Sequence, residues 1–383
     1  MELIFPLNLD RLGHPLPLVG TTIALMGFGS LASRIPGGAW YRLSRARLLS
    51  VISLALMGLS TVGLGISAVW GVQACLGAVH GFAFGLATTF LLALLIEVRP
   101  QDESAAPTMA WYTAAISLGY ALGAPLAAQA IERFGYAGAF LISGLVGIAG
   151  ASLALALGPT NEGAQAVGRV HQPTAVLPTY GWRSVAHLPA GIWLATMLVF
   201  YINFVSDAYG AFFPIYAVGV GISVGTVGFL KSLQSVAGTG LRFAAVGLFR
   251  VVDAGLVSHV SVVAMALATI ALSTFTHEVA LAVVFVVLGA CRGLIRVTSA
   301  TIVAEERKRP GVDVGMASGV YNSGLDAGTM LGPPVAGALA GIMDIPGMFR
   351  VVAFVLPALY YVVWLAQRAR ASRPAIVGTR VAS

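Results

Sequence analysis

Eight ionisable side chains lie inside long apolar stretches of this sequence, and they are the first candidates for binding or catalytic chemistry. They are Arg34, His80, Asp207, Lys231, Arg242, Arg292, Arg296 and Asp326. A charged group near the centre of a lipid bilayer costs about 2.5–3.5 kcal/mol on insertion scales, so each needs a partner or a function. Counted along the expected helices at 1.5 Å per residue, Asp207 and Lys231 lie at a similar depth. An ion pair between these two side chains is therefore geometrically permitted.

Arg292 and Arg296 are four residues apart, so both side chains lie on one face of one helix. Asp326, in the next expected helix, lies at a similar depth. A pair between Asp326 and either arginine would leave the other arginine free. We expect this group to form a substrate or coupling site; a bracing network of buried charges is the alternative.

The remaining candidates are weaker. Arg34 and Arg242 lie nearer one membrane surface, where a long side chain can reach the headgroups. His80 occupies the repeat position of Arg292, although a lone histidine at a glycine-rich helix contact is more often a packing residue. Tyr112 and Asn322 lie early in equivalent helices and could offer hydrogen bonds to a ligand.

The composition places these residues in a membrane. The chain is 58% hydrophobic and 10% charged, with mean hydropathy +0.88, whereas soluble domains carry about 25% charged residues. We therefore expect an all-α polytopic membrane protein. The net charge of +7 does not indicate nucleic-acid binding here, because positive charge gathers in cytoplasmic loops of membrane proteins.

The chain contains two copies of one unit, residues 1–158 and 189–367. At an offset of 208, Phe5-Pro6 aligns with Phe213-Pro214 and Val19-Gly20 with Val227-Gly228; offsets of 212 and 209 align later segments, including Gly81 with Gly293. An apolar helix precedes the Phe-Pro landmark in the second copy only, so the first copy lacks its opening helix as written. Duplicated helical bundles are typical of secondary transporters.

Apolar stretches of roughly 20 residues, each long enough to cross about 30 Å of hydrocarbon, predict eleven spans. These are 17–40, 46–67, 71–96, 107–131, 137–158, 189–213, 225–248, 255–275, 279–303, 315–341 and 346–367. Arginine and lysine gather in alternate loops, which predicts that the central linker 159–188 and the basic tail 368–383 are cytoplasmic. We expect an inner-membrane protein with a cytoplasmic C-terminus, and we expect it to be a monomer.

After the first span comes the segment Gly37-Gly38-Ala39-Trp40-Tyr41-Arg42-Leu43-Ser44-Arg45. It resembles the loop signature of the major facilitator superfamily, with Gly37, Arg42 and Arg45 matching. In that family the loop braces neighbouring helices and influences gating. The resemblance implies two pseudo-symmetric bundles with twelve helices in the complete fold, eleven of them present here.

A second signature occurs once in each half and resembles the Gly-Pro helix signature of exporters in that superfamily. Its residues are Gly119, Gly123 and Pro125 in the first half, and Gly328, Gly332, Pro333 and Pro334 in the second. Glycines four apart allow close approach of helix backbones, and proline bends a span. We expect each segment to act as a packing element, hinge or seal.

The resemblance implies a secondary active transporter of a small organic solute, working by alternating access with proton-coupled efflux as an antiporter; another coupling ion is the alternative. No phosphate-binding loop, metal-ligand spacing or nucleophile motif accompanies the spans, so we expect no cofactor, metal or enzymatic activity. Two other interpretations are a truncated or non-transporting relative, acting as a sensor or remnant, and an integral-membrane transferase.

Overall fold

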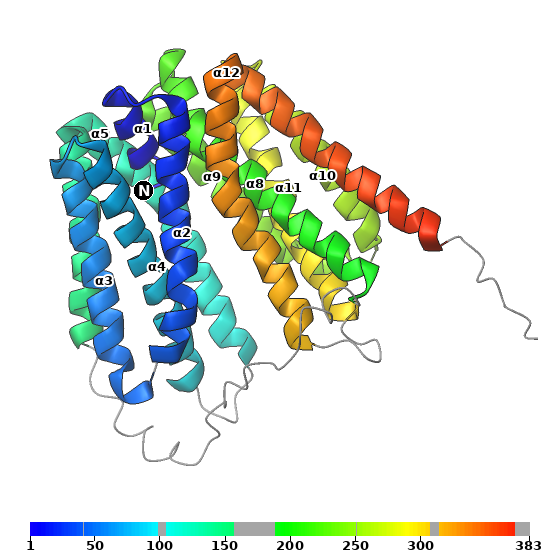
Figure 1. The fold of residues 1–383 in the computed structure, drawn as a ribbon, viewed down its shortest axis with the longest axis horizontal. Coiled ribbons are helices and arrows are strands. Elements are labelled where there is room, and N and C mark those ends of the chain that lie inside the picture. The colour runs from blue at the N-terminus through cyan, green and yellow to red at the C-terminus, as the bar shows by residue number, and fades with distance from the viewer. Residues whose placement is uncertain (41, 99–104, 157–187, 250, 307–313, 372–383) are drawn as a thin grey trace, which may run out of the picture.

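The computed structural model describes residues 1–40, 42–98, 105–156, 188–249, 251–306 and 314–371. Within them the chain forms two helical bundles (Figure 1). The first half contains α1 (Ile4–Arg11), α2 (Leu16–Trp40), α3 (Leu43–Ile66), α4 (Trp70–Val98) and α5 (Ala105–Ala156). The second half contains α8 (Ala190–Gly219), α9 (Val224–Leu248), α10 (Ala254–Ala271), α11 (Glu278–Glu306) and α12 (Val314–Ala371).

Two of these helices each contain two limbs joined by a tight turn. The turn in α5 lies at Gly135, with φ 69°, and the turn in α12 lies at Asp344, with φ 75°. With ψ of −177° at Gly135 and 170° at Asp344, this backbone conformation is freely adopted by glycine and strained for aspartate. The Asp344 carboxylate also accepts a 2.6 Å hydrogen bond from the backbone N–H of Gly347. The limbs correspond to four of the expected spans.

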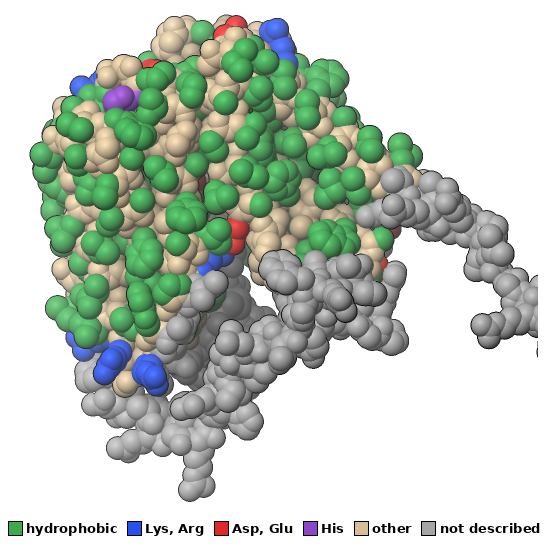
Figure 2. All heavy atoms as spheres, in the orientation of Figure 1, with side chains coloured by type: hydrophobic (Ala, Val, Ile, Leu, Met, Phe, Trp, Pro, Cys, Tyr) green, Lys and Arg blue, Asp and Glu red, His purple; other side chains and the backbone are tan. Residues whose placement is uncertain are grey.

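The described helices agree with an all-helical protein that crosses the membrane many times. Eight of them are long and apolar enough to span a membrane, and α5 and α12 are long enough to do so twice. Helix α9 is not among these eight, because Lys231 and Arg242 make it less apolar than the others. It nevertheless lies within the second bundle and covers the expected span 225–248. Exposed apolar side chains are spread over the whole height of the face shown in Figure 2.

Glycine contacts reveal the true register of the repeat. A Cβ added at Gly81 would lie 2.7 Å from the carbonyl carbon of Met26, and one at Gly289 would lie 2.9 Å from that of Gln234. Because Met26 and Gln234 are related by the offset of 208, Gly81 corresponds to Gly289. The alignment of Gly81 with Gly293 is therefore wrong by one helical turn. Glycines recur every four residues along these helices, so the sequence alone could not distinguish the two registers.

The corrected register changes the interpretation of His80. At the offset of 208 this residue corresponds to Leu288, a buried side chain, and no longer to Arg292. The His80 ring nitrogen Nδ1 lies 2.9 Å from the hydroxyl of Thr61 on α3. His80 is thus a hydrogen-bonded residue inside the first bundle.

The two halves pack together at one end and diverge at the other (Figure 1). We call the first end the α1 end, where α1, Gly135 and Asp344 lie, and the second the linker end, where α2 ends at Trp40 and α12 begins at Val314. At the α1 end, a Cβ at Gly20 would lie 2.9 Å from the carbonyl carbon of Pro333. Helices α2 and α12 therefore touch there through their backbones.

A second contact at the α1 end is the pseudo-symmetric counterpart of the first. A Cβ at Gly228 of α9 would lie 2.9 Å from the carbonyl oxygen of Ala124 of α5, next to Pro125. Gly20 and Gly228 are equivalent in the repeat, and each packs on the Gly-Pro segment of the opposite half. The Glu132 carboxylate adds a 2.8 Å hydrogen bond from the backbone N–H of Gly225.

The glycines of the two Gly-Pro segments differ in their surroundings. A Cβ at Gly328 or Gly332 would lie 2.5 or 2.6 Å from a carbonyl oxygen of α8, so α8 and α12 are in backbone contact. A Cβ at Gly119 or Gly123 would meet nothing within 4 Å. Among the described residues, α1 occupies the place in the first half that corresponds to the last two turns of α8.

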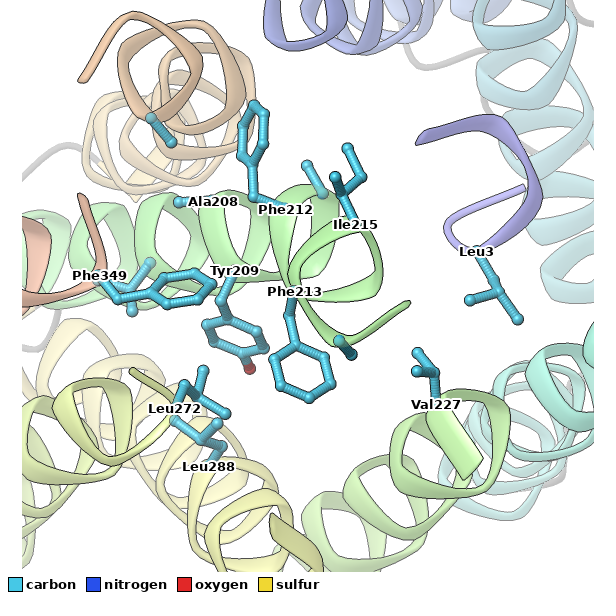
Figure 3. Close-up of a cluster of buried hydrophobic side chains, with 14 of the residues drawn as sticks. Leu3, Ala208, Tyr209, Phe212, Phe213, Ile215, Val227, Leu272, Leu288 and Phe349 are labelled. Atoms are coloured by element: carbon cyan, nitrogen blue, oxygen red, sulfur yellow. The ribbon is translucent and has the colours of Figure 1, made fainter. Parts of the chain in front are cut away.

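Buried aromatic side chains of α8 form the centre of the second bundle. Figure 3 shows Tyr209 and Phe213 of α8 grouped with Phe349 of α12, and Leu288 of α11 faces them. The rings of Phe213 and Phe285 meet edge to face with centroids 4.8 Å apart. Such contacts add about 0.5–1.5 kcal/mol to the free energy of area burial. The core holds α8 in place, and with it the charged residues described next.

Candidate functional site

The charged centre of the second half is formed by α8 and α11. Asp207 of α8 interacts electrostatically with Arg292 and Arg296 of α11, and Arg292 is the strongest of its charged neighbours. The side chain of Thr329 on α12 hydrogen-bonds to the Asp207 carboxylate. Three residues that the sequence singled out, Asp207, Arg292 and Arg296, thus lie together.

Helix α9 contacts α11 through glycines, and this contact aligns their basic residues. A Cβ at Gly238 would lie 2.8 Å from the carbonyl oxygen of Gly289, so the two backbones touch. Arg242 lies one turn beyond Gly238, and Arg292 lies close to Gly289. As a result Arg242 interacts electrostatically with Arg292 and Arg296. The expectation that Arg242 lies apart and reaches for the membrane surface does not describe this arrangement.

Lys231 does not form the ion pair with Asp207 that depth alone permitted. Its side chain is buried, with 7% of the residue exposed. Its ammonium Nζ donates 2.9 Å hydrogen bonds to two carbonyl oxygens, those of Glu2 and Gly210. A Lys–Asp ion pair within 4.0 Å is absent among the described residues.

Proline explains why these two carbonyls need a donor. In an α-helix the carbonyl of residue i accepts from the N–H of residue i+4, and proline has no N–H. Pro214 therefore leaves the carbonyl of Gly210 without its helical partner, and Pro6 does the same to that of Glu2. The two carbonyls are equivalent in the repeat, and one lysine ammonium satisfies both. Lys231 thereby ties the N-terminal segment to α8.

Asp326 pairs with Arg34 of the other half, with Oδ1 3.2 Å from Nη2. The predicted pair between Asp326 and Arg292 or Arg296 is therefore wrong. Depth along the helix placed these residues at one level, but Asp326 shares the face of α12 that carries Pro333, seven residues later, and that face meets α2. The Arg34–Asp326 pair is the one salt bridge found within the described segments.

The contacts along α2 show how the halves separate. Gly20 touches the backbone of α12, whereas a Cβ at Gly27 would lie 3.9 Å from the Thr329 side chain. Seven residues further, only the long Arg34 side chain reaches α12, and it is 52% exposed. Figure 2 shows a hollow between the halves on this side, with charged side chains of both signs at its margin.

Polar side chains of both halves surround the charged centre. Gln234 of α9 donates to the Tyr209 hydroxyl, and Arg296 lies 3.4 Å from the Asn203 amide oxygen. Tyr120 of α5 interacts electrostatically with Arg292, although it belongs to the other half. With 48% of its surface exposed, Tyr120 faces open space between the halves. Sequence reasoning missed these residues, because neutral polar side chains are common within membrane spans and do not mark a functional site as a buried charge does.

Other candidate residues lie outside this centre. Asn322 is exposed, while its neighbour Tyr321 lies 3.0 Å from the Ser299 hydroxyl of α11 and interacts with Arg296. Tyr112 is half-buried on α5. The equivalence of Tyr112 with Tyr321 in the repeat was the signal that could have directed attention to Tyr321.

The loop residues after α2 lie at the linker end. Gly37 is buried, and a Cβ there would lie 3.0 Å from the Leu86 side chain of α4. Arg42 precedes α3 with extended backbone, and Arg45 is exposed in its first turn. Neither arginine forms an ion pair with another described residue. Most of the predicted linker and tail lies outside the described residues, although α12 continues to Ala371.

A comparison with family models assigns the chain to one family, and solved structures share its fold. A family model described as Major Facilitator Superfamily matches residues 3–312. The solved structure of the nucleoside transporter NupG is similar, with TM-score 0.78, 11% identity and coverage of 97% of this chain and 95% of that one. A bacterial homolog of the human lysosomal transporter Spinster, in an inward-facing and occupied conformation, gives TM-score 0.72 and 12% identity over 96% and 95% of the two chains. A search of curated protein sequences found no match.

Proposed function

The chain belongs to the major facilitator superfamily and is an integral membrane transporter, and from this premise we propose that it carries a small organic solute by alternating access. The observation that supports this proposal most is the arrangement of the halves. They touch through backbone at the α1 end and diverge toward the linker end, and the charged centre of α8 and α11 lies within reach of Tyr120 of the first half. In such a fold, rocking of one bundle against the other exposes a central site to each side in turn.

In this proposal the two Gly-Pro segments close the α1 end. Gly20 and Gly228 allow the backbones of opposite halves to approach within contact distance. Reversal of the transport cycle then requires both contacts to separate while the linker end closes. With the linker end cytoplasmic, as the distribution of basic residues favours, the present conformation faces inward.

We infer that Asp326 carries the coupling proton. It is a carboxylate inside a span, and the described charge that acts on it is Arg34 of the other half. Protonation of Asp326 removes the attraction that holds α12 to α2 on the open side. Proton binding and release can therefore bias the equilibrium between the two conformations without contact between the proton and the solute. Efflux by proton antiport is the direction that the paired Gly-Pro signatures favour.

Transport by purified protein in vesicles with an imposed pH gradient tests this function. The expected result is solute flux that depends on the gradient and reverses when the gradient is reversed. Asp326→Asn is expected to abolish gradient-driven accumulation but to retain exchange of solute at equal pH. Asp10→Asn, which changes a carboxylate of α1 outside the predicted spans, is the matched control.

Two results would contradict the proposal in different ways. Full gradient-driven accumulation by Asp326→Asn would exclude that residue as the proton carrier. Absence of flux for every solute tested, in protein that remains folded and monodisperse, would favour the non-transporting alternative. Mass measurement of the detergent-solubilised protein tests the proposed monomer.

A further inference from the structure

The charges around the centre between the halves do not balance. The described cationic side chains are Lys231, Arg242, Arg292 and Arg296, and the carboxylates that interact with them are Asp207 and Glu2. Arg34 and Asp326 neutralise each other and do not change this count. The Lys231 ammonium is held by two carbonyl oxygens. The donors of Lys231 are thus satisfied, and the buried donors of this group that have no partner among the described residues belong to the arginines.

Neither Arg242 nor Arg296 forms an ion pair with a described carboxylate, and Asp207 acts on Arg296 less strongly than Arg292 and Arg242 do. The charge that acts on Arg242 is another cation, Arg292. The strongest charged neighbours of Arg296 are Arg292 and Arg242, and its hydrogen bond goes to the neutral amide of Asn203. Arg242 Nε and Arg292 Nε are buried, and neither has a hydrogen-bond partner among the described residues. Buried donors in such a position normally have a partner.

We propose that Arg242, Arg292 and Arg296 bind an anionic group of the transported solute, a carboxylate or a phosphate monoester. This inference rests on the proposed transport function and names the substrate class of the same centre. A guanidinium presents planar pairs of N–H donors that match two oxygens of one anion, and such paired contacts are among the strongest hydrogen bonds in proteins.

The geometry assigns separate tasks to the three arginines. Arg292 already interacts with Asp207, so an incoming anion competes with that carboxylate for it. No described carboxylate acts on Arg242, and Asp207 acts on Arg296 less strongly than Arg292 and Arg242 do, so these two arginines supply the net attraction. Tyr120 of the opposite half lies close enough to interact with Arg292 and Arg296, so an anion bound there would contact both halves.

Binding of matched charged and neutral compounds to the purified full chain tests the inference. The pairs are glycerol 3-phosphate with glycerol, uridine 5′-monophosphate with uridine, and succinate with 1,4-butanediol. Titration calorimetry in detergent is expected to show that the charged member of at least one pair binds at least tenfold more tightly than its neutral twin. The phosphate and carboxylate pairs identify which anion the centre prefers.

Variants then assign the binding to these side chains. Arg242→Gln and Arg296→Gln are each expected to weaken binding of the preferred anion about tenfold or more, since each removes a charge-assisted contact. Arg133→Gln, at the exposed turn of α5, is the matched control. If both centre variants fail to fold, the comparison of charged with neutral compounds on the unaltered protein still decides the matter.

The outcomes separate this inference from the proposed function. Equal binding of charged and neutral members of every pair, or an undiminished affinity in folded Arg242→Gln and Arg296→Gln, would overturn the inference. Flux of a neutral solute with no effect of anions would leave transport intact and refute the anionic substrate. Anion binding without flux of that anion in vesicles would support the binding centre and contradict transport.

Discussion

Lys231 provides the sharpest test of the contact between α1 and α8. Its ammonium donates to the carbonyl oxygens of Glu2 and Gly210 at 2.9 Å each. Pro6 and Pro214 have no N–H that could donate to these carbonyls within a helix. In Lys231→Met both partly buried carbonyls lose their donor. A fully buried polar group without a partner costs about 1–3 kcal/mol, so the two carbonyls together are expected to lower the free energy of unfolding by at most about 2–6 kcal/mol.

A second substitution tests the reason for this loss. Pro214→Ala gives α8 a backbone N–H four residues after Gly210, and that N–H can satisfy the carbonyl within the helix. In the Lys231→Met background, Pro214→Ala is expected to restore about 1–3 kcal/mol. In the unaltered protein it gains little, because Lys231 already occupies the carbonyl. Pro6→Ala provides the equivalent test at Glu2.

Reversible unfolding in detergent by titration with sodium dodecyl sulfate, followed by circular dichroism, measures these differences as a double-mutant cycle. The quantity of interest is the coupling between positions 231 and 214. Equal effects of Pro214→Ala in both backgrounds would refute the reasoning, because the lysine would then stabilise the fold by some other interaction.

Two further predictions concern glycines at backbone contacts, and both use a matched glycine as control. Gly20→Ala places a methyl group against the backbone of α12, and this overpacking costs about 1–3 kcal/mol. The population is therefore expected to shift toward the conformation open at the α1 end by roughly 5–150-fold. Gly27→Ala on the same helix is expected to shift this population little. Spin-label distances across the α1 end report this, and an unchanged distance distribution for Gly20→Ala would contradict the seal. Gly332→Ala is expected to lower stability in detergent by about 1–3 kcal/mol, because its Cβ would lie 2.6 Å from the Phe204 carbonyl oxygen, whereas Gly123→Ala, with nothing within 4 Å, is expected to be neutral or slightly stabilising. Equal losses for the two would show that Gly123 is packed.

The sequence predicts the bundle architecture well, because apolar stretches recur along the chain and the whole unit is repeated. Apolar stretches of membrane-spanning length and the landmarks Phe5-Pro6 and Phe213-Pro214 are enough to define the helices and their duplication. The register across α4 and α11 is lost for a related reason. Glycines spaced four apart, such as Gly77 and Gly81, align equally well with themselves after a shift of one turn.

Pairing of charges is not predictable in the same way. Depth along a helix follows from counting residues, and it brings Asp207 to the level of Lys231, with which it interacts electrostatically. The same count grouped Arg292 with Asp326 and did not place Asp207 beside Arg292. The face of a helix that meets a given neighbour depends on how the two halves pack. Asp326 lies against Arg34 because its face of α12 packs on α2. The role of Lys231 could have been found, since both prolines and their free carbonyls are visible in the sequence. What the sequence does not reveal is that these carbonyls lie side by side.

The crossed contacts at the α1 end have a consequence for how that end opens. Gly20 meets the Pro333 segment and Gly228 meets the Ala124 segment, so each half contributes one glycine and one proline-containing segment. Rigid bundles cannot exchange one of these contacts for the other, and a path for ions opens only after both have separated. Their free energies therefore add, and the corresponding equilibrium constants multiply. Two weak closures acting in parallel give a leak far rarer than either would allow alone, and the protein gains a tight barrier without a single strong bond that would slow its cycle.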